Sequence, residues 1–227
     1  MSFTLDTLPK AFKRCEKVMR AVKKISEGEI LILTDDEDRE NEGDLVFAAE
    51  CSSPQKINFL AKEARGLICL SLEPEIVDKL ELPMMRDPKK SSPLFDTAFT
   101  MSIEAKEGVT TGISASDRSH TVKLASSLEA KAEDFVIPGH IFPLRANPKG
   151  VLGRCGHTEA SIDLAGLAGK RKAAVICEIL REDGELSRQK ELKELALKHG
   201  LESLTIRDLI IFRMLKEKVF ENSFSKT

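Results

Sequence analysis

The stretch from Thr34 to Leu45, T-D-D-E-D-R-E-N-E-G-D-L, constrains the fold of this chain more than any other part. Seven of its twelve residues are carboxylates, one is Arg39, and apolar runs typical of strands lie on both sides. So many like charges beside two strands repel one another unless positive charge lies among them. We therefore expect an acidic loop that binds a divalent cation, an anionic substrate held by Arg39, or both.

An EF-hand and a solvated turn both fit the acidic loop less well. An EF-hand loop that starts at Asp36 needs glycine at its sixth position, where Asn41 stands. A solvated acidic turn is the ordinary alternative for a run of acids. Arg39 among the acids favours a binding site instead, as does Gly43, whose permissive backbone lets several carboxylates converge.

The composition is that of an ordinary globular protein. The 227 residues are 41% apolar and 32% charged, with a net charge of −2, which predicts a soluble chain with a substantial core. No basic tract indicates nucleic-acid binding, and no apolar stretch approaches the roughly 18 residues of a membrane span. The N-terminus lacks the apolar segment of a signal peptide, so we expect a cytoplasmic protein. Five scattered cysteines indicate neither a zinc ribbon nor a disulfide framework.

Helical and strand patterns alternate along the chain, without an internal repeat or a linker. Spacings of three and four predict a first helix whose apolar face carries Leu8, Phe12, Cys15, Met19 and Val22. Some predicted strands follow one another directly, while others alternate with helices, which favours a mixed sheet. We therefore expect an α/β (α+β) fold in which residues 1–227 form a single domain, with a mixed β-sheet flanked by helices.

Four local expectations are specific enough to compare with a structure. Residues 97–103 alternate apolar and polar side chains, which predicts a half-buried strand. Residues 135–145 predict a strand, a glycine turn and a second strand. Ser187 is expected to cap a helix that ends at Gly200, and residues 86–96 are expected to form a mobile polar loop.

A second polar group, R-x-G-H-T-E, runs from Arg154 to Glu159 and precedes an apolar helix. Backbone N–H groups at a helix start attract anions, and an arginine can grip a phosphate through two hydrogen bonds. Thr158 either caps the helix or offers its hydroxyl to the same anion. His157 is either a metal ligand or a partner within the turn, and its setting favours the functional role.

Glu178 and His140 are the remaining candidates. Glu178 lies in the apolar strand A-A-V-I-C-E-I-L, on the face shared by Ala174 and Ile176. A buried carboxylate is costly unless it is paired or protonated, so Glu178 is either a strand end that reaches water or a general acid/base. His140 lies between two prolines in an apolar segment, which holds it stiffly for a structural role or for a site.

Five motifs occur here in the order of one known family: D-D-E-D-R-E-N-E-G-D-L, T-A-F-T-M-S-I-E-A, G-V-T-T-G-I-S-A-S-D-R, P-G-H-I-F-P-L-R and G-H-T-E-A-S-I-D-L-A-x-L-A-G. Over residues 21–212 the chain resembles 3,4-dihydroxy-2-butanone 4-phosphate synthase. The resemblance implies an α/β domain that acts as a homodimer, with active sites at the subunit interface. It also implies conversion of D-ribulose 5-phosphate into L-3,4-dihydroxy-2-butanone 4-phosphate and formate, in riboflavin biosynthesis. The implied cofactor is Mg²⁺, with Mn²⁺ as a substitute.

The resemblance also implies roles for single residues. Glu40 and His157 match the metal ligands, and His140 and Glu178 match residues essential for catalysis. Either Thr110 or Thr111 is expected to add to phosphate binding, and Thr111 is taken as the candidate. The substrate-binding positions are matched by Arg39, Glu40, Asp44, Arg154, Cys155, Gly156, His157, Thr158 and Glu178.

Some features of the sequence lie outside this pattern. Cys155 stands where the family commonly has a small residue, and Asp35, Asp36, Glu37 and Asp38 receive no role. The cysteine spacing of a fused GTP cyclohydrolase II domain is absent, so we expect a monofunctional synthase. A non-enzymatic divalent-metal module is a second hypothesis, but it leaves the arginine, histidine and glutamate motifs unexplained. A sugar-phosphate isomerase or aldolase-like enzyme is a third, and it would release no formate.

Overall fold

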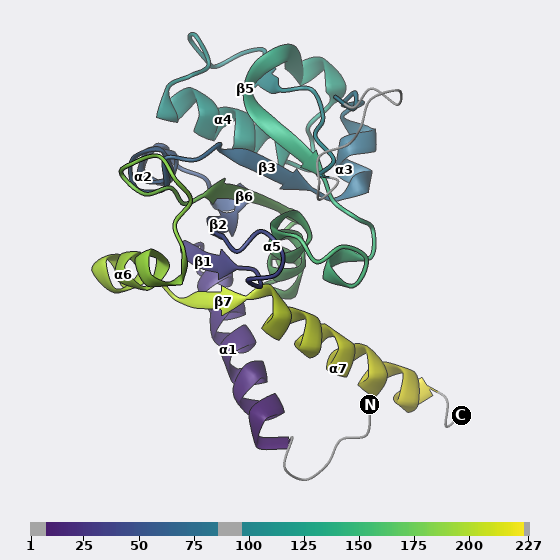
Figure 1. Ribbon diagram of the computed structural model, residues 1–227. Coiled ribbons are helices and arrows are strands. Elements are labelled where there is room, and N and C mark those ends of the chain that lie inside the picture. Colours follow the sequence, from purple (N-terminus) through teal and green to yellow (C-terminus); the bar gives the residue numbers. More distant parts are fainter. Residues whose placement is uncertain (1–7, 86–96, 225–227) are drawn as a thin grey trace.

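One mixed sheet organises the protein (Figure 1). The computed structural model describes residues 8–85 and 97–224, with side chains described in 13–85 and 97–217. The strands are β1 (Leu31–Thr34), β2 (Gly43–Ala48), β3 (Cys69–Leu72), β4 (Ile103–Ala105), β5 (Phe135–Arg145), β6 (Ala173–Glu178) and β7 (Ser203–Thr205). They lie in the order β4-β5-β3-β6-β2-β1-β7. Two neighbouring pairs are parallel and the others antiparallel, which confirms the predicted mixed sheet.

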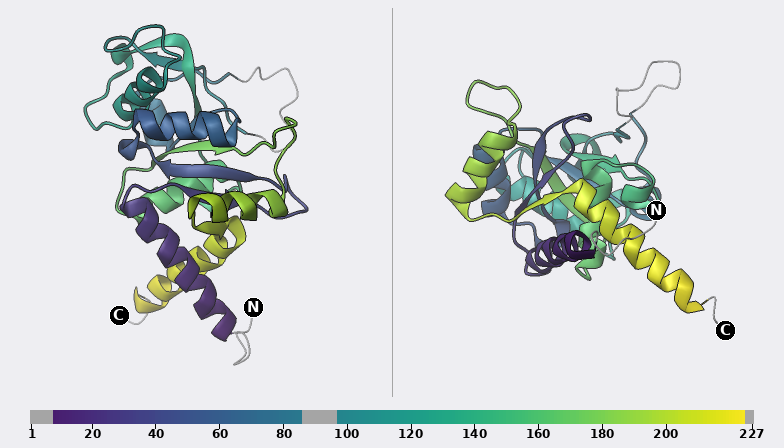
Figure 2. Two further views of the ribbon diagram at one scale, coloured as in Figure 1. Left: turned by 90° about the vertical axis from the view of Figure 1, so that its left-hand side faces the viewer. Right: turned by 60° about the horizontal axis from the view of Figure 1, so that its bottom comes forward.

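Helices cover both faces of the sheet, as predicted (Figures 1 and 2). The α-helices are α1 (Leu8–Ser26), α2 (Pro54–Phe59), α3 (Pro74–Lys79), α4 (Ala115–Ala125), α5 (His157–Leu167), α6 (Gln189–His199) and α7 (Ile206–Phe224). A π-helical turn, Leu60–Ala64, continues α2, and short 3₁₀ turns span Ala49–Cys51, Ala132–Asp134 and Gly150–Leu152. One core lies between the sheet and α2, α3, α4 and α6, and a second lies between the sheet and α1, α5 and α7. None of the described helices is long and apolar enough to cross a lipid bilayer.

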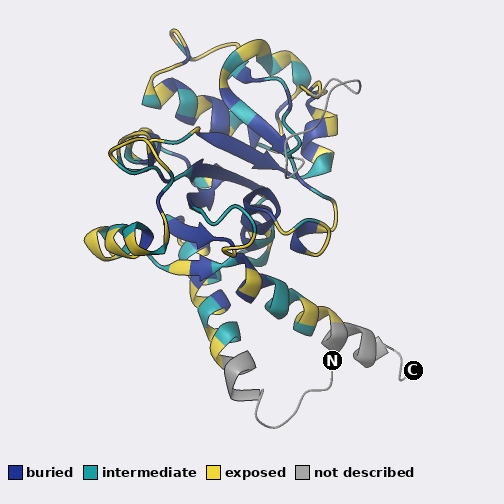
Figure 3. Cartoon of the chain, in the orientation of Figure 1, coloured by how far each residue is buried: buried dark blue, intermediate teal, exposed yellow. Residues whose placement is uncertain are grey.

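The central strands are buried along almost their whole length, because both of their faces are covered (Figure 3). The antiparallel pairing of β2 with β6 places Asp44 directly opposite Glu178. These two acids therefore stand at the end of an apolar layer, where an unpaired charge is costly. The register of the sheet thus fixes the first two members of the site.

The first predicted helix is present as α1, but its most buried face lies beside the predicted one, of which Val22 still packs partly buried against the core. Val18 and Ala21 are fully buried against the sheet, whereas Met19 is 54% exposed. The helix carries two apolar stripes, and spacing alone does not say which of them faces the sheet. Leu8 and Phe12 lie in α1 but outside the described side chains.

Two strand predictions are corrected by the structure. The predicted hairpin at residues 135–145 is one continuous strand, β5. Gly139 is not a turn residue: a Cβ there would overlap the carbonyl group of Ile103 on β4, so glycine permits a close approach of the two strands. Of residues 97–103, only the last belongs to a strand, while Phe99 and Thr100 make isolated bridges. The alternation does not mark a buried apolar face either, because the polar Thr100 and Ser102 are buried whereas Phe99 and Met101 are only partly buried.

The predicted start of α6 is also corrected. Arg188 is its N-cap residue, whereas Ser187 is buried and donates its backbone N–H to the carbonyl of Ile179 (2.9 Å). Ser187 is therefore bound to the segment after β6 and not to the helix. Gly200 ends α6 in the left-handed conformation, as predicted. The predicted mobile loop at 86–96 lies outside the described residues.

Candidate active site

Neighbouring strands and α5 enclose a small polar cavity of about 110 Å³ on one face of the sheet. Its floor includes Asp44 from β2 and both Ile176 and Glu178 from β6, which share a face because strand side chains alternate. Seven of the residues singled out in the sequence line it: Arg39, Glu40, Asp44, Arg154, His157, Thr158 and Glu178.

Asp35 holds the acidic loop in shape. Its side chain is buried, and its Oδ1 accepts a hydrogen bond from the backbone N–H of Glu42 (2.9 Å). Its Oδ2 accepts from the backbone N–H of Glu40 (3.0 Å) and from the Arg39 guanidinium (2.9 Å). The three acids that follow Asp35 are exposed. The loop therefore curls around one buried carboxylate, with Glu40 and Glu42 both at the cavity.

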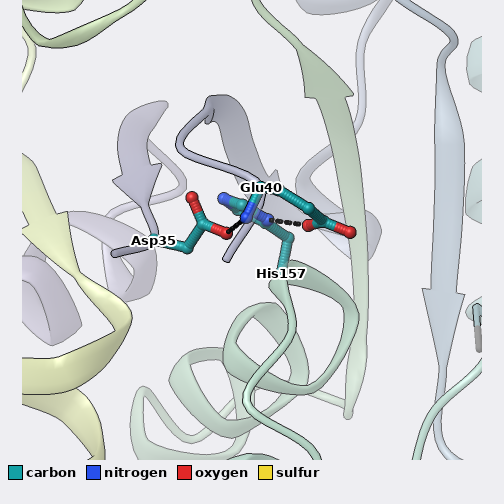
Figure 4. A group of neighbouring side chains, drawn as sticks. All are labelled: Asp35, Glu40 and His157. Carbon is teal, nitrogen blue, oxygen red and sulfur yellow. Dashed lines mark hydrogen bonds and ion pairs between the residues drawn. The ribbon is translucent and has the colours of Figure 1, made fainter. Parts of the chain in front are cut away.

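His157, the first residue of α5, faces this loop (Figure 4). Its Nδ1 lies 3.6 Å from Glu40 Oε2, and its Nε2 lies 3.9 Å from Asp44 Oδ1. His157 Nε2 and Asp44 Oδ1 are buried, and neither makes a hydrogen bond within the described part of the chain. Two buried polar atoms that face each other without a bond are the arrangement expected around an ion.

Two overlapping sets of donor atoms fit a metal ion. One consists of Asp35, Glu40 and His157, the other of Glu42, Asp44 and His157, with all donor atoms of a set within 4.8 Å of one another. Carboxylate oxygens with one imidazole suit Mg²⁺ or Mn²⁺. Because both oxygens of Asp35 already bond to the loop, Glu40, Glu42, Asp44 and His157 are the better candidates for ligands.

Charge is concentrated at this point. Burial would lower the pKa of His157, but the Asp44 carboxylate and the ion pair with Glu40 raise it to about 9. Burial raises the pKa of Glu42 to about 7 and also raises that of Asp44, against the opposing charge of His157. Burial would raise the pKa of Glu40 too, but His157 and Arg39 lower it. Without metal, the imidazolium thus neutralises part of the acidic cluster.

Arg154 also lines the cavity and is held from two sides. Its Nη1 donates to Glu159 Oε2 (2.7 Å) and its Nη2 to Thr97 Oγ1 (2.9 Å). Glu159 is fully buried, and its other oxygen accepts from the backbone N–H of Asn147 (2.9 Å). The adjoining helix start has Gly156 as its N-cap, with no described side chain bonded to its free N–H groups. A guanidinium beside an uncapped helix start suits a phosphate.

Glu178 lies half-buried at the end of β6. Its Oε2 accepts a hydrogen bond from the backbone N–H of Leu67 (3.0 Å), which fixes the direction of the carboxylate. Glu178 is therefore the last residue of its strand, and it also lines the cavity, where a general acid/base would have to lie.

Four of the predicted residues do not line the cavity. Thr111 is exposed in the loop before α4, and Cys155 is exposed beside the helix start. Gly156 contributes only as the N-cap of α5. His140 is on β5, where its side chain is 43% exposed and pairs with Glu104.

Sequence reasoning missed Glu42, which lines the cavity, and Glu159, which holds Arg154. Both had a signal. Glu42 follows Glu40 and precedes Asp44 by two residues, the period that places side chains on one face of an extended chain. Glu159 closes the G-H-T-E motif, where a carboxylate near an arginine predicts an ion pair.

Known proteins match this chain over the part of the sequence that forms the cavity. The family model of 3,4-dihydroxy-2-butanone 4-phosphate synthase matches residues 19–212. A riboflavin biosynthesis protein RibBA of Aquifex aeolicus is 54% identical over 210 residues, which are 90% of this chain and 50% of the relative. A 3,4-dihydroxy-2-butanone 4-phosphate synthase of Agrobacterium fabrum is 48% identical over 210 residues, 92% of this chain and 97% of the relative.

Solved structures agree with the sequences. A 3,4-dihydroxy-2-butanone 4-phosphate synthase in complex with two magnesium ions is 37% identical and superposes with a TM-score of 0.84, over 88% of this chain and 97% of that one. The chain spans about half the length of several relatives, including those of Aquifex aeolicus and Pseudomonas aeruginosa. The match nevertheless covers most of this chain, including every residue of the cavity. The chain belongs to the 3,4-dihydroxy-2-butanone 4-phosphate synthase family.

Proposed function

We propose that the protein is a Mg²⁺-dependent lyase, with residues 1–227 as one synthase domain and Mn²⁺ as an alternative ion. It converts D-ribulose 5-phosphate into L-3,4-dihydroxy-2-butanone 4-phosphate and formate, a step of riboflavin biosynthesis. The observation that carries the proposal is the cavity itself, where the facing, unbonded Asp44 Oδ1 and His157 Nε2 lie near Arg154. The family match and the relative solved with two magnesium ions support the same function.

Different residues of the chain would bind different parts of the substrate. Arg154, kept in place by Glu159, would bind the phosphate together with the N–H groups at the start of α5 and the hydroxyl of Thr158. Arg39 and Asp44 would orient the hydroxyl groups of the sugar. A phosphate fixed in this way holds the ketone end of the sugar towards the acidic loop.

Proton transfer is assigned to Glu178, which lies at the end of β6. When bound by Glu40 and His157, the divalent cation would acidify the carbon beside the ketone. Glu178 would then take a proton from the sugar or return one, because the Leu67 N–H fixes one of its oxygens at the cavity. Asp44 lies directly opposite Glu178 on β2 and faces His157, so the acid/base group and the candidate metal ligands border the same cavity.

A second copy of the chain would complete the site. His140 lies outside the cavity, on a stretch of β5 where Val136 and Ile137 are each 43% exposed, and Ile113, close to Thr111 in the sequence, is 53% exposed. Exposed apolar side chains around a histidine suit an interface between copies. A homodimer that joins this surface to the partner's cavity would bring His140 and Thr111 to the substrate.

The decisive measurement is formate release from D-ribulose 5-phosphate with Mg²⁺ present. Formate should appear with wild-type protein and disappear when a chelator removes the metal. Glu178→Gln should lose turnover by a factor of about 10²–10⁴, the usual effect of removing an acid/base group. Glu129→Gln, which alters an exposed carboxylate away from the cavity, is the matched control.

Two further outcomes would indicate a competing function, and a third would change the set of metal ligands. A five-carbon product without formate would indicate an isomerase, and metal binding without any turnover would indicate a metal module. Full activity of the His157→Ala protein at ordinary Mg²⁺ concentrations would remove His157 from the ligand set.

A further inference from the structure

Glu104 and His140 form a close pair on the two outermost strands, β4 and β5. Nδ1 of His140 lies 2.5 Å from Oε2 of Glu104. The carboxylate is only 13% exposed, whereas the imidazole is 43% exposed, so one side of the pair is fixed in the protein and the other faces outwards. We propose that Glu104 is a positioning residue that holds Nδ1–H of His140 and so presents Nε2 to the substrate. This inference rests on the function proposed above for His140.

The strands are built to bring the pair together. The β4–β5 register shifts where Ile103 pairs with Ile141 and Glu104 with Val136, so the β5 segment that carries His140 bulges beside Glu104. Gly139, directly before the histidine, lets β5 approach β4 more closely than any residue with a Cβ would allow. The contact therefore depends on the backbones of both strands and not on two flexible side chains that happen to meet.

A loop covers the carboxylate from another side. Gly112 has a φ of +86°, and a Cβ at this position would overlap the Glu104 carboxylate, so the loop lies directly on it. Asp117 fixes that loop: its Oδ2 accepts from Thr110 N–H (3.2 Å), Thr110 Oγ1–H (2.7 Å) and Gly112 N–H (3.1 Å). Glu104 is thus confined by a rigid turn, and its free direction is towards His140.

This contact determines the chemistry of the imidazole. An ionised carboxylate only accepts hydrogen bonds, so the proton of the neutral ring must lie on Nδ1 and the lone pair on Nε2. The same contact fixes the plane of the ring. Groups that orient a metal-bound histidine in this way typically change activity or affinity by about 10- to 100-fold when they are removed, and we expect an effect of the same order here.

The test compares Glu104→Gln with Glu107→Gln, which alters an exposed carboxylate just beyond β4. Long-range ¹H–¹⁵N spectra of the imidazoles, recorded in alkaline buffer and assigned with His140→Ala, report the tautomer; the chain has only four histidines. Wild-type and Glu107→Gln proteins should show His140 as the Nδ1–H form. Glu104→Gln should show a mixture, because an amide can donate as well as accept.

Formate kinetics provide the second readout. Glu104→Gln should lower kcat by about 10- to 100-fold and leave KM within about twofold, because Glu104 does not bind the substrate. The inference is overturned if wild-type His140 is the Nε2–H form, a result that does not depend on the folding of the Glu104 variant, or if Glu104→Gln keeps wild-type kcat. Wild-type turnover by His140→Ala would instead refute the role proposed for His140, while the spectra still decide whether Glu104 sets its tautomer.

Discussion

Asp35 lies within the acidic loop, yet both of its oxygens bond to the loop itself. Asp36, Glu37 and Asp38, which follow directly, are exposed. Of four adjacent acids with similar chemistry, one is therefore buried and holds the loop in shape, and the other three are exposed to solvent. What separates them is burial, because a carboxylate that is removed from water needs donors, and the backbone of the loop supplies them.

Asp35→Asn should weaken metal binding about tenfold, because asparagine loses the charge and one of the two acceptor oxygens that curl the loop. Mn²⁺ binding followed by electron paramagnetic resonance measures this directly. Asp36→Asn removes an equal charge one residue along and should bind Mn²⁺ nearly as tightly as wild type. Equal affinities in the two variants would show that the buried bonds of Asp35 do not shape the site.

The segment between β6 and α6 holds the acidic loop from outside. Arg188, the N-cap residue of α6, donates through Nη1 to the carbonyls of Glu40 (2.9 Å) and Asn41. Asn41 has a φ of +52°, a conformation that asparagine tolerates better than most residues. The loop thus depends on α6 as well as on its own sequence, and the shape of the metal site is coupled to the seating of that helix.

Arg188→Met keeps the unbranched apolar stem of the side chain but removes both hydrogen bonds to the loop. We expect Mn²⁺ affinity to fall severalfold and the free energy of unfolding to fall by about 1 kcal/mol. The matched control is Arg181→Met, since Arg181 pairs its guanidinium with exposed Asp183 near the same helix. If both variants bind Mn²⁺ like wild type, the hydrogen bonds from Arg188 do not shape the metal site.

The π-helical turn is joined to α6 by Glu63, which accepts hydrogen bonds from Lys198 (2.8 Å) and His199 (2.9 Å). These bonds, with Lys198 first, lower the pKa of Glu63 to about 2. An unfolded glutamate has a pKa of about 4.3. Because the folded pKa is the lower one, this stabilisation is complete above about pH 5 and is lost as the pH falls towards 2.

Glu63→Gln should therefore lower the free energy of unfolding by about 1 kcal/mol at neutral pH, a modest value because Lys198 is largely exposed. The difference from wild type should shrink steadily below about pH 5. Urea unfolding at a series of pH values measures it, with Glu129→Gln as a control that should show no such trend. A difference that stays constant with pH would rule out the ionised form as its source.

Much of the architecture follows from local sequence. Ser53 before Pro54 predicts a helix start, and the Ser53 side chain does accept from the Lys56 N–H (3.2 Å). The failures share a cause. Gly139 gave the signal of a turn, yet it serves a contact with a strand more than thirty residues away in the chain. A local pattern names the glycine but not the partner that requires it.

The site divides in the same way. The motifs identify Glu40, Asp44 and His157 by residue type, and the sheet and α5 bring them together. Asp35 and Arg188 bind the loop through its backbone N–H and carbonyl groups, and the sequence does not show which backbone groups a side chain will bind. His140 is harder to place. The sequence identifies the residue, and the structure of one copy of the chain shows that it lies outside the cavity. The proposed site requires a second copy, which neither of them contains.

Mixing two inactive variants tests that requirement. His140→Ala and Glu178→Gln should each lose turnover, but a heterodimer would contain one site with both groups intact, Glu178 from one copy and His140 from the other. After unfolding and refolding an equal mixture, about half of the dimers should be mixed, so about a quarter of wild-type activity should return. Each variant refolded alone gives the baseline. If the mixture stays at that baseline while sedimentation shows mixed dimers, His140 does not act across the interface, because only a group supplied by the partner can be restored in this way.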